Sequence, residues 1–376
     1  MSRKIAVLGA GNGGHAMSFL LARGGHQVIL FEHPDFAQNL KGIEQRGGIE
    51  AVSGIMRDGR QISAWTSGFV KVHGLTTDMK TALDHADLVL MIVPSFAQEP
   101  MFRLALPHLR DGQILVILPG NFASLVFKRM MREQGIRKKV TFAETNTIPP
   151  ACRIVEPGKV FIVAYKAGVE VATMPSTNIH EVAGELKDVL RLEIHPLKNV
   201  LEAGFENVNM VVHPAAAVLN MGLAESRQGA FYFYKEGMSA SVSKVQQKID
   251  DERLTIGKAL NLQLRSFIEV TKMIYHFEFD SIHEFALKSP IHNSFGSDFP
   301  STPRDRYVSE DCPYLLVPVH GFGKVLGIEA SAMGSIVRIA SIYNEVDYFE
   351  EGRCLAKLGV SGMNKEGILE YVQQSF

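Results

Sequence analysis

The sequence predicts a doubly wound α/β domain with a parallel sheet, followed by a mainly α-helical domain. Short apolar runs bounded by turn residues recur along the first half of the chain, which is typical of parallel strands buried on both faces. A glycine-rich turn directly follows the first of these runs. Longer helical patterns replace the short runs beyond about residue 198. We therefore expect one domain over residues 1–197 and a second over residues 198–376.

The expected strands of the first domain alternate with helical segments. A helix with Ala16, Phe19 and Leu20 on one face follows the first strand and ends at Gly24-Gly25, giving a strand–helix–strand unit. Residues 43–63 contain several glycines and predict an irregular or hairpin insertion. The five strands are expected at Ile5–Leu8, Val28–Phe31, Leu88–Val93, Ile114–Leu118 and Val140–Ala143.

The later segments change from mixed to helical character. Two β-like stretches between Val160 and Thr173 flank a Lys166-Ala-Gly turn, and a helix is expected over residues 178–190. Residues 288–305 are rich in Ser, Pro and Asn and predict loops. Long helices are expected at Ser239–Ala259, Leu262–Tyr275 and Val325–Asn344.

The composition excludes several classes of protein. A net charge of -1 and a pI near 6.9 offer no general attraction to nucleic acid. No apolar run approaches the roughly 18 residues of a membrane-spanning helix, and the N-terminal run is too short for a signal peptide. Three scattered cysteines indicate a reducing compartment, so we expect a cytoplasmic protein. No His/Cys/Asp cluster has metal-ligand spacing, so no metal is expected.

The glycine-rich turn has the GxGxxG spacing of a dinucleotide-binding loop, between the first strand and the first helix. Gly9 would permit the tight turn, Gly11 the approach of a pyrophosphate, and Gly14 close packing of the helix. The alternative is a glycine-rich turn without a ligand. The cofactor-binding residues expected here are Gly9, Ala10, Gly11, Asn12, Gly13 and Gly14.

An acidic residue ends the second strand. Glu32 stands 21 residues after Gly11, where a carboxylate accepts hydrogen bonds from the ribose hydroxyls and repels a 2′-phosphate. Since His33 rather than an arginine follows, we favour NAD over NADP as the cofactor. NADP remains the alternative, because Lys41 or Arg46 could fold back to the site.

Polar residues also follow two further expected strands. Pro94-Ser95 and Asn121 lie where the carboxyl edge of the sheet is expected, and ligands of doubly wound folds bind at that edge. We therefore expect Pro94, Ser95 and Asn121 to be cofactor neighbours. The alternative for Ser95 and Asn121 is a helix N-cap, which needs no ligand.

A histidine in an apolar helical setting is the candidate proton carrier. The imidazole of His213 can carry a proton near neutral pH, although taken alone the segment favours a buried histidine bonded to a backbone carbonyl. A charged cluster at residues 304–313 includes Arg306 and Asp311, which are suited to clasp a carboxylate and orient a histidine, respectively. The cluster also fits a solvated charge run. Phe231–Tyr234 would either pack in the core or line a cleft.

Together, five motifs resemble the opine dehydrogenases, the family that includes octopine dehydrogenase. The resemblance spans nearly the whole chain, and its third and fourth motifs are the more specific. It implies a Rossmann-type first domain and a helical domain like that of 6-phosphogluconate dehydrogenase. In order, the motifs are GAGNGGHA, AETNTIPPACR, ENVNMVVHPAAAVLN, RYVSEDCPYLLVP and DYFEEGR.

The resemblance implies an oxidoreductase of amino acid metabolism that uses NAD or NADP to condense an α-keto acid, pyruvate-like, with the amino group of an amino acid. It places the catalytic histidine at His213 and its partner acid at Asp311. Arg306 then pairs with a substrate carboxylate or steadies Asp311. Substrate contacts are expected at Glu144, Thr145, Asn209 and Arg306. Pro149-Pro150 replaces the aromatic residue that often stands in the second motif, which would reshape the amino-acid pocket.

Two rival functions stay open at this point. The first is a 2-hydroxyacid, ketopantoate or glycerol-phosphate type dehydrogenase of the same architecture. Such enzymes resemble a pattern with a lysine donor on the first long helix of the second domain, where this chain has His213. The second is a non-catalytic dinucleotide-sensing protein, against which the intact His213, Arg306 and Asp311 argue. The sequence leaves the individual substrates and the oligomeric state undetermined.

Overall fold

The chain folds into two units, which we describe one at a time from a computed structural model. The structure describes residues 2–373, apart from residues 54–55, 58–59, 62 and 295–298. The first unit comprises the chain up to Ala203 and its C-terminal end from Val372, and the second unit runs from Gly204 to Tyr371. The expected domain boundary at 197/198 falls slightly earlier, just before helix α8 (Val200–Phe205).

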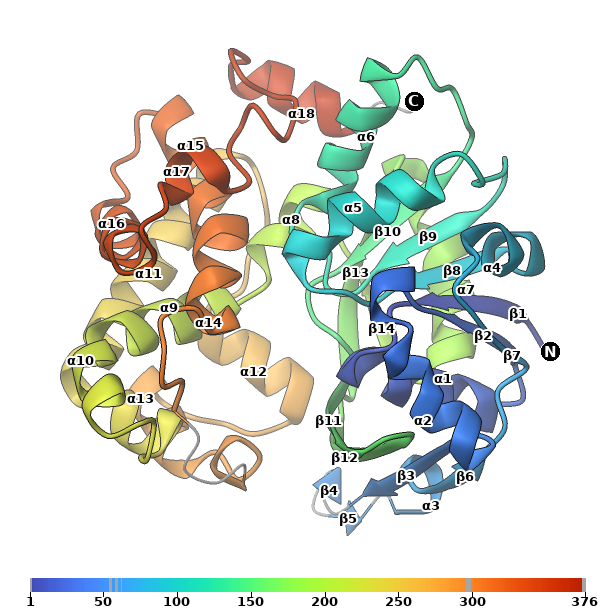
Figure 1. Ribbon diagram of the computed structural model, residues 1–376. Helices are drawn as coiled ribbons and strands as arrows, with labels where there is room; N and C mark the ends of the chain where they lie inside the picture. Colours follow the sequence, from blue (N-terminus) through green and yellow to red (C-terminus); the bar gives the residue numbers. More distant parts are fainter. Residues whose placement is uncertain (1, 54–55, 58–59, 62, 295–298, 374–376) are drawn as a thin grey trace. The chain divides into compact units, whose positions relative to one another are not determined.

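The first unit is built on an eight-stranded sheet with the order β14-β13-β10-β9-β8-β1-β2-β7 (Figure 1). Neighbouring strands are parallel except for β10 and β13, which are antiparallel. All five strands expected from the apolar runs are confirmed. The strands are β1 (Lys4–Leu8), β2 (Gln27–Phe31), β7 (Gly74–Thr76), β8 (Leu88–Met91), β9 (Ile114–Ile117), β10 (Thr141–Thr145), β13 (Gly168–Met174) and β14 (Glu193–Pro196).

The strand order reverses on either side of β1, which pairs with β2 on one edge and with β8 on the other. In the middle of this register, Val7 lies opposite Leu30 and Leu90, and all three side chains are fully buried. In open α/β sheets, ligands bind at the carboxyl ends of the strands where the order reverses. The loops after β1, β2, β8 and β9 are therefore the ones to inspect for a site.

Helices pack against this sheet and complete the core. A stack of aromatic rings joins α5, α6 and β10, where the Phe102 and Phe127 centroids lie 3.9 Å apart and Phe142 meets both edge-on. The helices are α1 (Asn12–Arg23), α2 (Gln38–Arg46), α4 (Met79–His85), α5 (Ser95–Ala105), α6 (Ala123–Glu133) and α7 (Ile179–Leu190).

A second, four-stranded sheet with the order β11-β12-β3-β6 belongs to the same unit. It comprises β3 (Ile49–Ser53), β6 (Gly68–Val70), β11 (Pro150–Glu156) and β12 (Lys159–Tyr165). The expected insertion at 43–63 therefore contributes the end of α2, strand β3, and the short pair β4 (Met56–Arg57) and β5 (Arg60–Gln61), before α3 (Ser63–Thr66). Part of it lies outside the described residues. The two stretches flanking Lys166 are strands as expected, but β12 and β13 enter different sheets.

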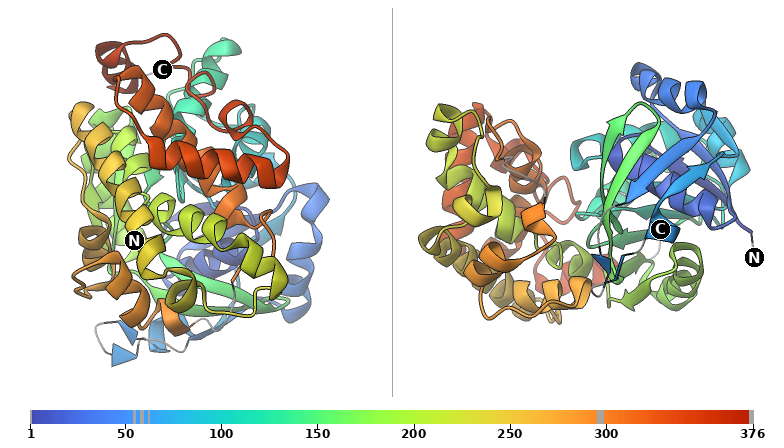
Figure 2. Two further views of the ribbon diagram at one scale, coloured as in Figure 1. Left: turned by 90° about the vertical axis from the view of Figure 1, so that its left-hand side faces the viewer. Right: turned by 90° about the horizontal axis from the view of Figure 1, so that it is seen from below.

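The second unit consists of helices and loops in its described part (Figures 1 and 2). Two expected helices are shorter than predicted. Helix α12 begins at Phe267 because Ser266 forms a capping box with Glu269, and the expected 325–344 helix is interrupted where Gly327 adopts a φ of 66°. The helices are α9 (Asn209–Leu219), α10 (Met221–Ser226), α11 (Ala240–Ala259), α12 (Phe267–Tyr275), α13 (Ile282–Lys288), α14 (Arg306–Ser309), α15 (Val317–Val325), α16 (Ser331–Asn344), α17 (Tyr348–Glu351) and α18 (Lys365–Gln373).

A buried ionic cluster lies inside the helical unit. The Arg253 guanidinium is fully buried, lies 2.7 Å from an Asp250 oxygen, and has a Glu206 oxygen at 3.7 Å. Glu206 Oε1 accepts a hydrogen bond from the Arg265 backbone N–H, whereas its Oε2, the oxygen nearest Arg253, accepts no hydrogen bond from the described residues. Burial raises the pKa of Glu206 to about 7, although the two arginines oppose the shift.

Among the described residues, no helix is both long enough and apolar enough to cross a membrane.

Candidate active site

The glycine loop after β1 has the geometry that a bound pyrophosphate requires. Gly9 adopts a φ of 103°, which favours glycine, and a Cβ on Gly14 would lie 1.8 Å from the Gly9 carbonyl oxygen. A Cβ on Gly11 would meet no atom within 4 Å, so this face of the loop is open. The first turn of α1 contains no acidic residue that would oppose an anion. These features fit a dinucleotide phosphate group at the start of α1.

Other parts of the loop are held from within the protein. The His15 ring nitrogen Nδ1 lies 3.1 Å from the Gly11 carbonyl, and burial lowers the pKa of His15. Asn12 Oδ1 accepts a hydrogen bond from the Ile154 backbone N–H at 2.8 Å, which ties the loop to β11. The Asn12 side chain therefore links the loop to β11. The Asn12 backbone, at the start of α1, remains the predicted contact for a phosphate group.

Glu32 lies at the end of β2 and faces the glycine loop. Its Oε2 accepts hydrogen bonds from the Ala10 backbone N–H at 3.0 Å and from Asn39 Nδ2 at 2.9 Å. Its Oε1 accepts one from the His33 backbone N–H at 2.8 Å. The carboxylate is thus held rigidly beside the loop, and Oε1 retains lone-pair capacity for a further donor such as a ribose hydroxyl.

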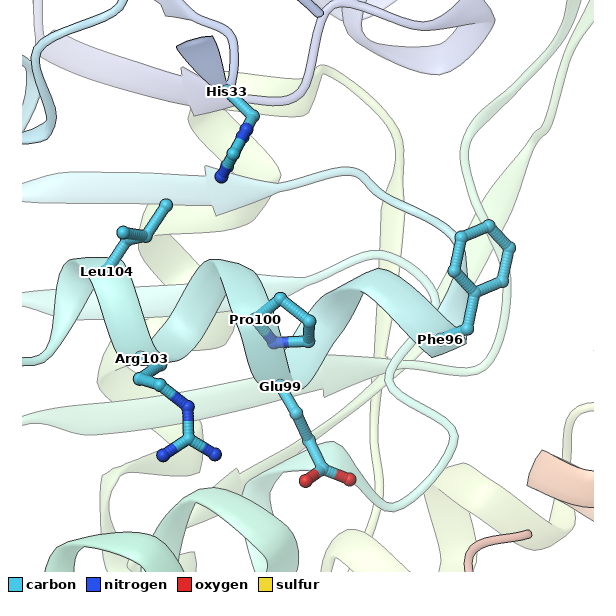
Figure 3. A pocket seen from close by; sticks show the side chains of 6 residues that line it. All are labelled: His33, Phe96, Glu99, Pro100, Arg103 and Leu104. Carbon is cyan, nitrogen blue, oxygen red and sulfur yellow. The ribbon is translucent and has the colours of Figure 1, made fainter. Parts of the chain in front are cut away.

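An open pocket of about 440 Å³ begins at the residue after Glu32 (Figure 3). Figure 3 shows His33 on one side of it and helix α5 on the other, with Phe96 at the N-terminal end of that helix. The Phe96 ring is 59% exposed, which is unusual for an aromatic residue that packs in a core. Sequence reasoning missed this pocket because its lining residues follow different strands. It is lined by His33, Phe96, Glu99, Pro100, Arg103 and Leu104.

Ser95 and Asn121 meet at the carboxyl edge of the sheet, as the sequence predicts for neighbouring strands. Asn121 Nδ2 donates a hydrogen bond to Ser95 Oγ at 2.8 Å, and both side chains are buried. Neither residue is a helix N-cap, because Pro94 precedes α5 and Phe122 precedes α6. The helix-cap alternative is therefore wrong for both residues, and they remain predicted cofactor neighbours together with Pro94.

Glu144 and Thr145, the expected substrate contacts, are buried on β10, and their contact with substrate remains a prediction. The Glu144 carboxylate is 0% exposed and accepts hydrogen bonds from the backbone N–H groups of Phe122 and Ser124 at 2.9 and 2.7 Å. The Thr145 hydroxyl is buried and points to the Ile117 carbonyl oxygen at 3.4 Å. Both residues belong to β10. Their side chains form hydrogen bonds with the last residue of the neighbouring strand β9 and with residues that follow it.

In the helical unit, His213 and Asp311 form a close pair. His213 Nδ1 lies 2.7 Å from Asp311 Oδ2, and the two side chains are only 9% and 7% exposed. His213 comes from the middle of α9, and Asp311 follows α14, which packs against α9. The alternative of a buried histidine bonded to a backbone carbonyl is therefore wrong. The contact leaves Nε2 as the ring nitrogen that can exchange a proton.

Aromatic rings fix the plane of the histidine. The Tyr307 ring stacks on the His213 ring with centroids 3.9 Å apart and an angle of 19°, and Phe233 meets the same ring edge-on at 5.9 Å. Asn220 donates hydrogen bonds to the carbonyls of Ala216 and Gly237, which joins α9 to the segment that carries Phe233. Of the aromatic residues 231–234, Phe233 therefore packs against the histidine ring.

Arg306 and Asn209 lie close to this pair along the chain. Arg306 is exposed, sits 5.7 Å from the Tyr307 ring centroid, and forms no ion pair with any described carboxylate. Asn209 is the half-buried first residue of α9, one helical turn before His213 and therefore on the same face. Arg306 and Asn209 remain predicted substrate contacts.

Two family models match the two halves of the chain. The model described as NAD-dependent glycerol-3-phosphate dehydrogenase N-terminus matches residues 4–134. The model described as NAD/NADP octopine/nopaline dehydrogenase, alpha-helical domain, matches residues 196–344, which include His213 and Asp311. The glycine loop and the histidine–aspartate pair thus each fall in a segment typical of a nicotinamide-dependent dehydrogenase.

An opine dehydrogenase from Arthrobacter sp. (strain 1C) is 31% identical over 373 residues, and the alignment covers 99% of both chains. The chain belongs to the opine dehydrogenase family. Vitopine synthase from Allorhizobium ampelinum is 26% identical, with 98% of each chain covered. A solved structure of octopine dehydrogenase with NADH and L-arginine superposes with a TM-score of 0.77 at 20% identity, covering 98% of each chain.

As a member of the opine dehydrogenase family, the protein is an NAD(P)-dependent oxidoreductase that acts on the CH–NH group of its donors. This confirms the family that the motifs resemble and the expected fold, a Rossmann-type sheet followed by a helical domain. The rival hydroxyacid, ketopantoate and glycerol-phosphate dehydrogenase functions give way to the opine dehydrogenase assignment, although residues 4–134 match a model shared with glycerol-phosphate enzymes.

Proposed function

We propose that this opine dehydrogenase condenses a small α-keto acid with the amino group of an amino acid, using NAD(H) in preference to NADP(H). The observation that carries the proposal is the 2.7 Å contact between His213 Nδ1 and Asp311 Oδ2. This contact orients a nearly buried imidazole so that one nitrogen is available for proton transfer. A simple binding protein has no use for such an arrangement.

The reaction needs a proton at two stages, and His213 is suited to supply it. Protonated His213 gives a proton from Nε2 to the keto oxygen as the amino nitrogen adds to the keto carbon, and it takes back the proton that this nitrogen loses. It then gives a proton to the resulting hydroxyl group, which leaves as water and leaves a protonated C=N bond. Asp311 accepts the hydrogen bond from Nδ1–H and stabilises the charged ring while it holds that proton. The reduced dinucleotide, when bound, supplies the hydride for the C=N bond. Tyr307 and Phe233 keep the ring plane constant throughout.

Arg306 is the proposed partner of a substrate carboxylate. The sequence left open whether it binds substrate or steadies Asp311. Arg306 is exposed and forms no ion pair with a described carboxylate, which supports the substrate role. Desolvation lowers the pKa of Arg306, but Tyr307, Glu310 and Asp311 raise it above its ordinary value, which supports a role beside Asp311 as the alternative. Asn209 would add an amide hydrogen bond from the same face of α9 as His213.

Glu32 supports the preference for NAD(H). Its carboxylate accepts hydrogen bonds from three donors of the protein, so it is held in place beside the glycine loop. A fixed negative charge there accepts hydrogen bonds from ribose hydroxyls and repels a 2′-phosphate. The adjoining pocket with the exposed Phe96 ring fits the adenine base.

Related proteins support the substrate classes. Octopine dehydrogenase has been solved in complex with NADH and L-arginine, an amino acid, and in complex with NADH and pyruvate, an α-keto acid. By analogy, we propose substrates of these two classes for this chain.

The test is the oxidation of NADH, followed by absorbance, with small α-keto acids alone and then with each amino acid added. Consumption that requires both substrates is expected, with NADPH consumed much more slowly in parallel reactions. Consumption with the keto acid alone would overturn the condensation and favour a hydroxyacid dehydrogenase. If NADPH served equally well, the role given to Glu32 would be wrong.

A further inference from the structure

A buried carboxylate on β10 shapes the loop that follows β9. Glu144 is 0% exposed, and its Oε2 accepts a hydrogen bond from the Phe122 backbone N–H at 2.9 Å. Its Oε1 accepts one from the Ser124 backbone N–H at 2.7 Å and another from the Ser124 hydroxyl. Three donors from one loop thus converge on a single carboxylate, which is held in a place where an unpaired charge would be costly.

The loop adopts a conformation that its residues would not choose alone. Asn121 and Phe122 have φ angles of 54° and 68°, in the left-handed region that non-glycine residues rarely occupy. A Cβ on Gly120 would lie 2.1 Å from Glu144 Oε2, so the backbone rests directly on the carboxylate. The conformation therefore persists because Glu144 supplies the hydrogen bonds that favour it.

On its other side, the same loop contacts α5. Asn121 Nδ2 donates to Ser95 Oγ at 2.8 Å, and Gln98 Nε2 donates to the Pro119 carbonyl at 2.9 Å. These contacts place Ser95 and Asn121 together at the carboxyl edge of the sheet. Glu144 thus acts on the predicted cofactor neighbours through the backbone of residues 120–122.

The strand order indicates which half of the cofactor this loop serves. The loop after β1 fits the pyrophosphate, and Glu32 after β2 fits the ribose of the adenosine half. Strands β8 and β9 lie on the opposite side of β1 from β2, so their loops face the other half of a dinucleotide laid across the sheet. That half carries the nicotinamide ring.

We propose that Glu144 is a positioning residue that holds residues 120–122 in the shape that receives the nicotinamide half of the cofactor. The inference rests on the dinucleotide site of the proposed function, but not on the choice of substrates. A carboxylate is needed rather than an amide, because a glutamine would present an NH₂ group to one of the loop's N–H donors. Substitution of Glu144 should therefore change the conformation of residues 120–122 and leave the glycine loop and Glu32 unchanged.

The test compares the binding of NADH with that of ADP-ribose, which lacks the nicotinamide ring. Glu144→Gln is expected to weaken NADH binding by about tenfold or more, while ADP-ribose affinity stays within about twofold of the wild type. Ser124→Ala removes one of the three donors and should shift the same ratio by a smaller factor. Affinities are measured by calorimetry on the full chain, after thermal unfolding confirms that each variant folds.

A matched control is Glu170→Gln, which changes another fully buried carboxylate of the same sheet. Glu170 lies on β13 and accepts a hydrogen bond from Asn146 Nδ2 at 2.9 Å. Its variant should keep the wild-type ratio of NADH to ADP-ribose affinity. If Glu144→Gln does not fold, Ser124→Ala carries the test alone.

Equal losses for both ligands, or no change for either, would overturn the positioning role. The measurement needs no turnover, so it still gives an answer if the enzyme does not require an amino acid. Failure of the proposed reaction would appear only in the NADH oxidation assay, and failure of the present inference only in the affinity ratio.

Discussion

The dinucleotide loop and the histidine–aspartate pair are built by different means. In the loop, Gly9, Gly11 and Gly14 lie within one short segment, and the backbone forms the site. In the helical unit, His213 and Asp311 are 98 residues apart, and their side chains form the site. The glycine loop depends on three positions that have no side chain. The histidine–aspartate pair depends on the two side chains themselves.

This difference separates two ways of losing function. A side chain added to the loop acts through steric exclusion, either of the cofactor or of the protein's own backbone. A substitution at His213 or Asp311 removes the proposed proton carrier or its partner, while the helices keep their packing. Variants of the glycine loop should therefore lose cofactor binding or stability, whereas variants of the histidine–aspartate pair should lose turnover.

The largest effect is expected from His213→Ala. Loss of the general acid–base group should lower kcat by about two to four orders of magnitude, while NADH affinity stays near the wild-type value. Steady-state kinetics and calorimetric NADH binding check both parts. His283→Ala is a control in the same unit, since His283 contacts the Met238 carbonyl and should leave kcat unchanged. Normal turnover of His213→Ala would remove the catalytic assignment.

A smaller loss is expected from Asp311→Asn. The amide keeps the shape of the side chain but no longer stabilises the charged ring, so kcat should fall by about one to three orders of magnitude. NADH affinity and the thermal unfolding temperature should stay close to those of the wild type. A variant that loses stability and not turnover would show that the His213–Asp311 contact is structural.

Two glycine variants sharpen the comparison from the cofactor side. Gly11→Ala points a methyl group into open space, so it should leave the unfolding temperature unchanged and weaken NADH binding by about tenfold or more. Gly14→Ala drives a methyl group to 1.8 Å from the Gly9 oxygen and should instead lower stability by about 1–3 kcal/mol or more. Thermal unfolding and calorimetry separate the two effects. Equal behaviour of the two variants would contradict the open face at Gly11.

The sequence predicted most where the determining residues are close together. The five core strands, the glycine loop and Glu32 follow from short local patterns. Strand β11 was missed because Pro149-Pro150 is typical of a loop, although Pro150 begins an edge strand, where its missing N–H is tolerated.

Contacts between distant segments were beyond local patterns. The role of Glu144 depends on the pairing of β9 with β10, which brings the carboxylate under residues 120–124. The pairing of His213 with Asp311 came from the family resemblance, because residues 98 apart show no spacing signal. The pocket beside His33 needs the packing of α5 against the end of β2, which periodicity does not supply.

The smallest expected effect is on the free energy of unfolding. It tests whether the buried Glu206 carboxylate destabilises the helical unit when it is ionised. Burial raises the pKa of Glu206 to about 7 from its ordinary value of 4.5. The folded chain then retains a proton that the unfolded chain releases, so stability is greatest at low pH and falls as the pH rises through 7. Glu206→Gln lacks this titration. Between pH 5 and pH 8, roughly, the wild type should lose up to about 3 kcal/mol more unfolding free energy than the variant, as measured by denaturant titration.

Parallel stability curves for the two proteins would show that Glu206 stays ionised beside Arg253 over this whole range. A steeper curve for the wild type would instead show that the buried arginine does not fully compensate for the burial of a second carboxylate, since Asp250 already holds Arg253 at 2.7 Å. The environment of Glu206 would then differ from that of Asp311 in the proposed catalytic pair. Among the described residues, Asp311 lies at hydrogen-bond distance from His213, whereas Glu206 shares its arginine with another acid and its Oε2 accepts no hydrogen bond.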